Sequence, residues 1–428
     1  MRARGNNQPR DAGPRARVCA RAFLFALALG LVVSCQTTDS LGFDLPLKPL
    51  TPPAAYPNPF KDRGHSDADI AAKINTAFMQ LFHGDPTNEA IYVVPPGSSG
   101  IAYINDVLHN DKRTEGIGLG MLIAVELDHR DEFDNLWTYA KSMMRVTSGP
   151  AAGYFNSFCE NALMLPAPCL DPFGLQQMTM ALLLAHDRYP PVPGMPARVD
   201  YVADVRDLLT LMRNKVFQNG GIVGGITDTF DGMTQLVYDV PNSSGAEVGR
   251  PSIEMPGCYD LWAQATGDPF WTNAAKAARD YWQLTANPTT GLTPVRATFA
   301  GVPVTGYEVF SSEAYRGQIA MALDQIWVGG DGWSPGEADR LLGFFASQGL
   351  LTYGQTYTLD GLTELNPNHD PALTAANGVS AAIATIAQRT AFVDAVWNMD
   401  IPSMGNRYFA GLLYLISLLV LGGQMHVL

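Results

Sequence analysis

The stretch RTEGIGLG at residues 113–120 leads into the apolar run MLIAV at residues 121–125. This pattern predicts a helix that begins near residue 117. An acid beside a helix N-terminus complements the helix dipole, which is the most common reason for a residue such as Glu115. The three glycines of the stretch each weaken a helix by up to ~1 kcal/mol relative to alanine, so they indicate close backbone approach to a neighbouring helix or a ligand. Their spacing, with no strand before it, does not match the dinucleotide-binding fingerprint.

Apolar residues spaced three and four apart predict roughly twelve helices in the chain. The predicted helices are 66–83, 117–129, 131–145, 174–188, 199–215, 256–266, 269–285, 312–327, 335–347, 371–387, 390–398 and 408–421. Twelve helices suggest six hairpins that close into an all-α (α/α)6 barrel, with apolar inner helices and amphipathic outer helices. No repeat of fixed length indicates a helical solenoid.

Long irregular stretches separate the predicted helices, and strand-like runs are few and short. The longest stretches are 91–114, 146–173, 217–255 and 286–311. Loops of this length in compact domains are often functional, so we expect them to form a cleft. The last predicted helix is shorter than the ~20 apolar residues that cross a bilayer, so it fits an inner barrel helix.

Residues 1–34 have the features of an export signal. Six arginines precede the apolar segment FLFALALGLVVS, which is too short to span a bilayer and ends at VVSC. Small residues before a cysteine resemble the bacterial lipobox, in which Cys35 becomes the lipidated first residue. A plain secretory peptide cut nearby is the alternative. Because Gln36 stands in place of an aspartate, we expect sorting to the outer membrane, on its periplasmic or surface side.

The segment 35–65 is predicted to be a tether between the anchor and a domain at 66–428. Six prolines lie between Pro46 and Pro59, which is typical of an extended, semi-stiff spacer. Ser66 begins the sequence SDAD, which offers a helix N-cap with an acid three residues later.

Charge and cysteine usage limit the expected partners. Loss of residues 1–34 removes six arginines and Asp11, which changes the formal net charge from −13 to −18. A domain with this negative net charge repels nucleic acid and anionic membrane surfaces. In an oxidising compartment Cys159 and Cys169 either form a disulfide or remain buried thiols. The seven histidines are scattered and no cysteine pair has ligand spacing, so no metal or cofactor is expected.

The stretch TEGIGLGMLIAV, followed by DEFDNLW, resembles the signature of glycoside hydrolase family 8. The resemblance extends over about residues 71–420 and includes YINDVLHNDKRTEG, GYF at 153–155, DPF at 171–173, SEAYR at 312–316, VWN at 396–398 and RYF at 407–409. It implies an (α/α)6 barrel that cleaves β-1,4-linked glycans with inversion. The layout is most similar to the oligosaccharide-trimming, reducing-end xylose-releasing branch.

Inversion requires two carboxyl groups about 6.5–9.5 Å apart on opposite faces of the sugar. The resemblance implies that Glu115 is the general acid and that Asp171 holds the sugar, unless Asp171 only forms a turn. The family's base is an aspartate, whereas this chain has Glu313, which is alternatively a first-turn acid in a helix capped by Ser311 or Ser312. The remaining matched positions are expected to contact sugar or, alternatively, to be ordinary packing or ion-pairing residues: Tyr154, Phe155, Arg316, Arg407 and Tyr408.

Several expected cleft positions depart from the family pattern. Leu119 replaces a tyrosine, Ser157 a tryptophan, Ile253-Glu254 a Tyr-His pair and Ala410 an aspartate. Because sugars stack on aromatic faces and bond to polar tips, we expect altered subsites. Glu254 either supplies a new carboxylate to the cleft or is a solvated loop acid.

The leading hypothesis is an exported, lipid-anchored inverting glycosidase. It acts as a monomer and without a cofactor on β-1,4-linked oligo- or polysaccharide of the xylo-oligosaccharide or β-glucan type. The alternatives are a catalytically impaired glycan-binding lipoprotein and an accessory protein of polysaccharide export. The orientation of Glu313 distinguishes the first two, because only a side chain that faces the cleft of Glu115 can serve hydrolysis.

Overall fold

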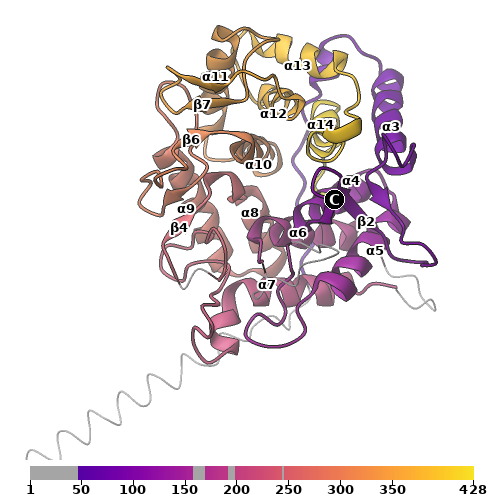
Figure 1. The fold of residues 1–428 in the computed structure, drawn as a ribbon, viewed down its shortest axis with the longest axis vertical. Coiled ribbons are helices and arrows are strands. Elements are labelled where there is room, and N and C mark those ends of the chain that lie inside the picture. Colours follow the sequence, from indigo (N-terminus) through magenta and orange to yellow (C-terminus); the bar gives the residue numbers. More distant parts are fainter. Residues whose placement is uncertain (1–46, 158–168, 191–197, 243–244) are drawn as a thin grey trace, which may run out of the picture. The chain divides into compact units, whose positions relative to one another are not determined.

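The computed structural model describes residues 47–157, 169–190, 198–242 and 245–428 (Figure 1). These residues belong to one compact unit, Leu47–Leu428. The predicted signal, the lipidation site Cys35 and the first part of the tether lie outside the described residues, as does Cys159.

Within the described residues, twelve helices form six hairpins, which confirms the predicted (α/α)6 barrel. Inner and outer helices alternate along the chain, and neighbouring inner helices pack in chain order until α14 closes against α4. The inner helices are α4 (Thr114–Glu126), α6 (Pro172–Arg188), α8 (Pro256–Thr266), α10 (Tyr315–Val328), α12 (Pro371–Ala381) and α14 (Phe409–Leu421). The outer helices are α3 (Asp67–His83), α5 (Arg130–Tyr139), α7 (Tyr201–Gln218), α9 (Pro269–Thr285), α11 (Ser334–Ser347) and α13 (Arg389–Asn398).

Sequence composition decides which helices lie inside. Every residue of α4 is buried, and so is every residue of α14 after Phe409. An outer helix such as α9 buries only one stripe, which includes Trp271, Ala275 and Trp282. A helix that is apolar on all sides must be surrounded by others, whereas an amphipathic helix covers a core with one face.

Asp-Pro pairs fix the N-termini of three helices. Asp171, Asp268 and Asp370 each accept a hydrogen bond from a backbone N–H of the first turn of the helix that follows. The proline that comes next needs no donor in the first turn and has the helical φ already. The same arrangement therefore starts the inner helices α6 and α12 and the outer helix α9.

Helix bounds agree with the sequence for α8 and α9 and differ elsewhere. Helix α4 begins at Thr114, three residues before the predicted start, and places Glu115 in its first turn. The predicted helix 131–145 continues past α5 as a π-helical turn at Ala140–Met144, and α12 ends at Ala381 rather than at 387. In α4, packing against α6 offsets the weak helix propensity of the glycines.

The glycines of the opening stretch allow helices to touch. A Cβ at Gly118 would lie 2.6 Å from Gln177 Cβ in α6, and one at Gly174 would lie 2.6 Å from the backbone nitrogen of Glu115. A Cβ at Gly116 would lie 2.8 Å from the ring of Tyr408. The close approach expected from the sequence is therefore to neighbouring helices.

Short antiparallel strands tie the long loops to the inner helices. They are β1 (Tyr92–Val93), β2 (Tyr103–Asp106) and β3 (Asp111–Lys112); β4 (Val248–Gly249) with β5 (Ala297–Thr298); and β6 (Val309–Phe310), β7 (Thr356–Thr358) and β8 (Glu364–Asn366). Strands β3, β4 and β6 end just before α4, α8 and α10, respectively. The loops at these helix starts are thereby held in fixed positions.

The predicted tether is wrong for its second half, because residues 47–65 pack on the barrel. Leu50 and Phe60 are buried, and the short helix α2 spans Pro59–Asp62. The Tyr56 hydroxyl accepts a hydrogen bond from the backbone N–H of Val427 at 2.8 Å. The prolines are interspersed with apolar side chains that find partners, so the folded part begins before Ser66.

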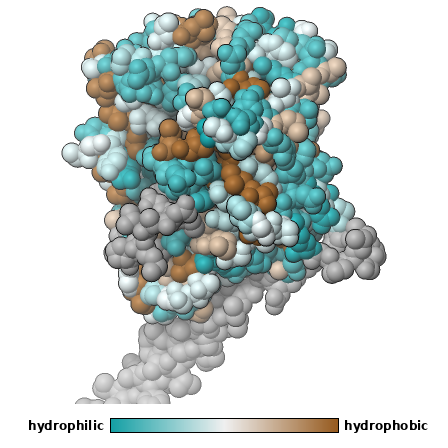
Figure 2. Space-filling model, turned by 45° about the vertical axis from the view of Figure 1, so that its right-hand side comes forward, coloured by the Kyte–Doolittle hydropathy of each residue, from teal (hydrophilic) through white to brown (hydrophobic). Residues whose placement is uncertain are grey.

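The surface shows no single large apolar face in the view of Figure 2, where small hydrophobic patches are set among hydrophilic residues. This mixture is usual for a folded globular domain. In the described ranges, no helix has both the length and the apolar character that crossing a membrane requires.

Replacement of Gly118 by alanine tests the contact between α4 and α6. We expect Gly118→Ala to lower the free energy of unfolding by about 1–3 kcal/mol, because the new methyl group overlaps Gln177. The control is Gly343→Ala in α11, where a Cβ would meet no atom within 4 Å and is expected to stabilise the helix by up to ~1 kcal/mol. Urea denaturation measures both, and equal changes would contradict the assigned contact.

Candidate active site

A cleft of about 220 Å³ lies at the N-terminal ends of α4, α6 and α10. Its walls carry four carboxylates and four guanidinium groups. The lining residues are Arg113, Glu115, Ser157, Cys169, Leu170, Asp171, Phe173, Asp239, Val240, Arg250, Arg296, Glu313 and Arg316. Glu115, Asp171 and Glu313, which the sequence singled out as acids, therefore share one cleft.

Glu115 and Arg316 form a bidentate ion pair. Arg316 Nε donates to Glu115 Oε1 at 2.5 Å, and Nη2 donates to Oε2 at 2.9 Å. Helices α4 and α10 stand three places apart in the ring of six, so the pair joins opposite sides of the barrel. Two parallel charge-assisted hydrogen bonds fix both orientation and distance.

Aromatic rings hold the Arg316 guanidinium in place. Its central carbon lies 5.4 Å from the ring centre of Phe173 in α6 and 5.3 Å from that of Phe409 in α14. Both distances are within the range of cation–π attraction. Nη1 also donates to the Glu313 carbonyl at 3.2 Å, so Arg316 connects the side chain of one acid to the backbone of the other.

Glu313 faces the cleft from the 3₁₀ turn Ser312–Ala314 that precedes α10. Its side chain is 43% exposed, and one carboxylate oxygen lies 3.6 Å from Arg250 Nη1. The capping alternative is not realised, because neither Ser311 nor Ser312 makes a side-chain cap hydrogen bond. Glu313 is thus open to solvent and directed to the same space as Glu115.

Asp171 combines both of its expected roles, since it caps α6 and lines the cleft. Its carboxylate accepts from the backbone N–H groups of Phe173 and Gly174, each at 3.2 Å. It also accepts from Thr114 Oγ1 at 3.3 Å and from Arg250 Nη2 at 3.2 Å. The cap therefore holds the carboxylate beside the start of α4.

Sequence reasoning missed the charged residues that the long loops bring to the cleft. Arg250 contacts Asp171 and Glu313 and pairs with Asp239 at 2.8 Å. Asp239 also pairs with Arg296 at 3.1 Å, and the Arg296 guanidinium lies 4.0 Å from the ring centre of Tyr307. The one signal in the sequence was the length of the stretches 217–255 and 286–311.

Four expected sugar contacts do not line the cleft in the structure. Tyr154 and Phe155 are buried, and the Tyr154 hydroxyl donates to the Thr227 carbonyl at 2.9 Å. Arg407 donates to the carbonyls of Ala90 and Met404, which ties loops together. Tyr408 is buried against Gly116. Tyr154, Phe155 and Tyr408 therefore fit the packing alternative, whereas Arg407 bonds to backbone carbonyls rather than forming an ion pair.

Besides Glu313, Ser157 is the position that departs from the family pattern and lines the cleft among the described residues. Leu119 and Ala410 are buried, so the smaller or apolar side chains there fill the core. Glu254 is fully buried, which contradicts both expectations for it. Cys169 lines the cleft, and its disulfide with Cys159 stays a prediction because Cys159 lies outside the described residues.

The hydrogen bonds around Glu254 indicate that its carboxyl group carries a proton. Gln176 Nε2 donates to the Pro172 and Ile253 carbonyls, so its Oε1 must be the acceptor of the Tyr259 hydroxyl proton at 2.6 Å. That hydroxyl already accepts from the Met255 N–H, and it lies 3.1 Å from Glu254 Oε2. Glu254 therefore donates to Tyr259, while its Oε1 accepts from a backbone N–H.

Glu254→Gln tests this proton through the pH dependence of stability. Burial raises the pKa of Glu254 from 4.5 to about 8. The stabilisation due to the raised pKa is fully present at a pH below the pKa of the carboxyl group in the unfolded state. It is lost as the pH rises toward 8. A glutamine makes the same hydrogen bonds without titrating. Between pH 5 and pH 8 we expect the free energy of unfolding of the wild type to fall. That of the variant should fall by about 2–5 kcal/mol less over the same range, as measured by urea denaturation. Parallel pH profiles would show that Glu254 is ionised in the fold.

The family model of glycosyl hydrolases family 8 matches residues 100–187, which contain Glu115 and Asp171. The chain is 31% identical over 380 residues to the reducing end xylose-releasing exo-oligoxylanase of Halalkalibacterium halodurans, with 87% of this chain and 94% of that relative covered. It is 30% identical over 383 residues to the reducing-end xylose-releasing exo-oligoxylanase Rex8A of Paenibacillus barcinonensis, with 87% and 96% covered.

A solved structure with the same fold supports the assignment. The family 8 xylobiose complex from Teredinibacter turnerae has a TM-score of 0.80 and 31% identity, and the match covers 87% of this chain and 97% of that chain. The likeness extends over nearly all of both chains and includes the helices that carry the cleft acids. The chain therefore belongs to glycosyl hydrolases family 8, with the reducing-end xylose-releasing exo-oligoxylanases among its relatives, and is an O-glycosyl hydrolase.

Proposed function

We propose that the enzyme hydrolyses β-1,4-linked xylo-oligosaccharides with inversion, with Glu115 as the general acid and Glu313 as the general base. The observation that carries the proposal is that both acids line one cleft, Glu115 from the first turn of α4 and Glu313 from the 3₁₀ turn before α10. Inversion needs two carboxyl groups on opposite faces of the sugar with room for a water molecule. The names of the relatives in the exo-oligoxylanase branch support the choice of substrate.

In the proposed reaction, Glu115 donates its proton to the leaving glycosidic oxygen as the bond from that oxygen to the anomeric carbon breaks. A water molecule attacks the anomeric carbon from the other face, and Glu313 takes the proton that this water loses. Both protons are thereby accounted for, and the product has the opposite anomeric form. Asp171, fixed by its cap, is a suitable acceptor for a sugar hydroxyl beside the start of α4.

The surroundings of Glu313 suit a base. Its side chain is 43% exposed, so water reaches the carboxylate, and its nearest cation, on Arg250, is 3.6 Å away. Asp239 also lines the cleft, but it pairs with both Arg250 and Arg296. Both oxygens of Asp239 are therefore engaged by guanidinium groups, whereas Glu313 is open to water, which favours Glu313 for this role.

Arg316 has two consequences for Glu115. It occupies both carboxylate oxygens, so the pair must loosen before Glu115 can carry a proton to substrate. Once the proton leaves, negative charge develops directly beside the guanidinium, where it is stabilised without reorganisation. The geometry of the pair therefore matches the state after proton donation.

A second candidate function is glycan binding without cleavage. It is favoured by the same ion pair, which leaves Glu115 no free oxygen, and by the few aromatic side chains in the cleft. Among the described lining residues Phe173 is the one aromatic, and its ring contacts Arg316. Binding of xylo-oligosaccharides by wild type with no product formed would support this function.

Substitution of the two acids tests the reaction. We expect Glu115→Gln and Glu313→Gln each to lower kcat on xylo-oligosaccharides by about 10²–10⁴-fold, because each removes one proton transfer. The control is Glu308→Gln, a change at an exposed residue outside the cleft. Product release by chromatography gives the rates, and NMR of the first product formed by wild type gives its anomeric form. Unchanged activity in Glu115→Gln, or a retained anomeric form, would refute the mechanism.

We also propose that the enzyme is exported as a monomer and anchored by lipid to the outer membrane. The features that support the anchor are the arginine-rich start, the short apolar segment and Cys35 within VVSC.

Cys35→Ser tests the lipid anchor. We expect this substitution to move the protein from the membrane fraction to the soluble fraction, because serine cannot take the thioether-linked lipid. Cys19→Ser, inside the signal, is the matched control and should leave the protein with the membranes. Cell fractionation followed by immunoblotting measures both, and a membrane-bound Cys35→Ser variant would argue against lipidation at this residue.

A further inference from the structure

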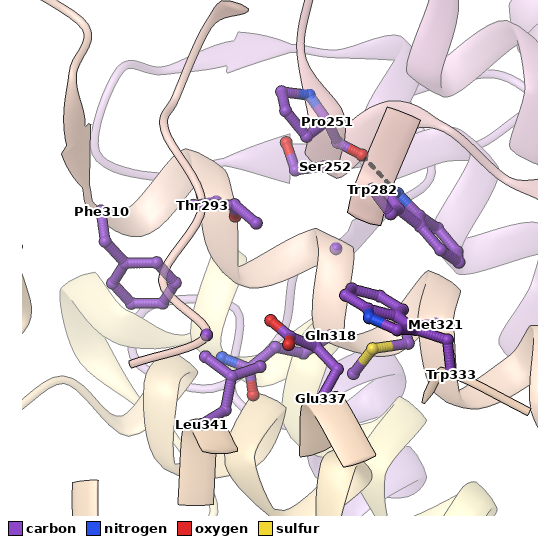
Figure 3. Close-up of a pocket in the computed structure, with 13 residues that line it drawn as sticks. Pro251, Ser252, Trp282, Thr293, Phe310, Gln318, Met321, Trp333, Glu337 and Leu341 are labelled. Carbon is purple, nitrogen blue, oxygen red and sulfur yellow. Dashed lines mark hydrogen bonds between the residues drawn. The ribbon is translucent and has the colours of Figure 1, made fainter. Parts of the chain in front are cut away.

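A second cavity lies behind the turn that carries Glu313, between α9, α10 and α11 (Figure 3). Its volume is about 30 Å³. Its walls are largely apolar and include Trp282, Trp333 and Phe310. Ala314 and Gly317, from the residues on either side of the start of α10, form part of its wall, so the cavity is adjacent to the proposed base without being part of the cleft.

Three buried polar side chains end in this cavity without a hydrogen-bond partner in the structure. They are Ser252 Oγ, Gln318 Nε2 and Glu337 Oε1, from residues that are 1%, 3% and 2% exposed. Figure 3 shows Gln318 and Glu337 close together, with Ser252 on the other side of the cavity. A buried polar group without a partner costs about 1–3 kcal/mol, so three in one cavity indicate a bound molecule.

The neighbouring hydrogen bonds place Gln318 Nε2 and Glu337 Oε1 on the side of the cavity. Gln318 Oε1 accepts from Ser380 Oγ at 2.9 Å, and the amide nitrogen is the end left to donate toward the cavity. Glu337 Oε2 accepts from Arg340 Nε at 2.8 Å, which leaves Oε1 as an acceptor. Burial raises the pKa of Glu337 to about 7, although the neighbouring Arg340 acts in the opposite direction. Ser252 can both donate and accept.

Size and chemistry together select the bound molecule. A water molecule needs a cavity of roughly 10–15 Å³, so about 30 Å³ holds one or two waters and no sugar ring. A cation is disfavoured because the Gln318 N–H group points into the cavity and because Arg340 already pairs with Glu337. Water fits this space, and it can accept from Gln318 and donate to Glu337 or Ser252.

We propose that this cavity is a site for one or two ordered water molecules held by Ser252, Gln318 and Glu337, and that the bound water positions the turn that carries Glu313. The second part rests on the proposed function, in which Glu313 is the base. Gln318 is therefore a positioning residue for the reaction.

Gln318 is close in the sequence to the residues of the proposed reaction. Gln318 lies in the first turns of α10, five residues after Glu313 and two after Arg316. Ser252 lies in the 3₁₀ turn Pro251–Ile253, and a Cβ at Gly317 would lie 3.3 Å from Ser252 Cα, so the two segments touch. Glu337 comes from α11 on the outside of the barrel. A water bound to all three joins the start of α10 to its surroundings.

A crystal structure of the wild type at about 1.5 Å tests the water site without reference to activity. We expect ordered density within about 2.7–3.2 Å of Gln318 Nε2, Glu337 Oε1 and Ser252 Oγ. A cavity without such density would overturn the proposal. This measurement stands even if the wild type hydrolyses no xylo-oligosaccharide, so failure of the proposed function and failure of the water site are distinguished.

Gln318→Met tests the positioning role, because methionine has a similar size and cannot donate. We expect kcat to fall about tenfold with KM within twofold, since displacements of the order of 1 Å in reacting groups cost up to ~100-fold in rate. Met321→Leu is the matched control, because Met321 lines the same cavity and bonds to no water. It should leave kcat within twofold.

Ser252→Ala is the second variant, for use if Gln318→Met does not fold. We expect it to lower kcat with KM unchanged and to shift Glu313 in its crystal structure relative to the wild type. Either variant with wild-type kcat and an unshifted Glu313 would overturn the positioning role.

Discussion

The bidentate ion pair between Glu115 and Arg316 determines the geometry of the cleft. It joins α4 to α10 across the ring of inner helices, and the rings of Phe173 and Phe409 hold its guanidinium from α6 and α14. Two charges this deeply placed lose much of their hydration, and close bidentate contact offsets that cost. Because Arg316 also donates to the Glu313 carbonyl, the pair connects Glu115, the proposed acid, to the turn that carries Glu313, the proposed base.

The barrel was predictable from the sequence because its helices follow from local apolar spacing, and the bounds of α8 and α9 agree with it. The early start of α4 was not predictable in this way. Its glycines indicated close approach to a helix or a ligand, but not that the partner is α6 or that the helix includes residues 114–116. The cleft positions of Glu115 and Asp171 were predictable because they match family motifs, and that of Glu313 because it stands where the family has an aspartate. Arg250 and Asp239 lie in irregular loops, and no periodicity indicates which charges such loops bring together.

Arg250 explains how a glutamate can stand where the family has an aspartate. The longer side chain of Glu313 extends the carboxylate to within 3.6 Å of Arg250, which is itself fixed by Asp171 and Asp239. Arg250 thereby restricts the positions of the carboxylate that we propose as the base. The separation of 3.6 Å is longer than a hydrogen bond, so the carboxylate remains available to water while its range of positions is restricted.

Hydrogen bonds between buried polar groups also connect the inner helices to one another. Glu254, Tyr259 and Gln176 join α6 to the start of α8, and Gln318 joins α10 to Ser380 in α12. Apolar side chains of similar volume would give equal or greater stability at these places. Apolar side chains would also allow a helix to pack in more than one rotation about its axis. The hydrogen bonds of these polar groups form in only one such rotation. Because Arg316 stands on the first turn of α10 and Glu313 on the 3₁₀ turn directly before it, a fixed rotation of that helix keeps both residues at the cleft of Glu115.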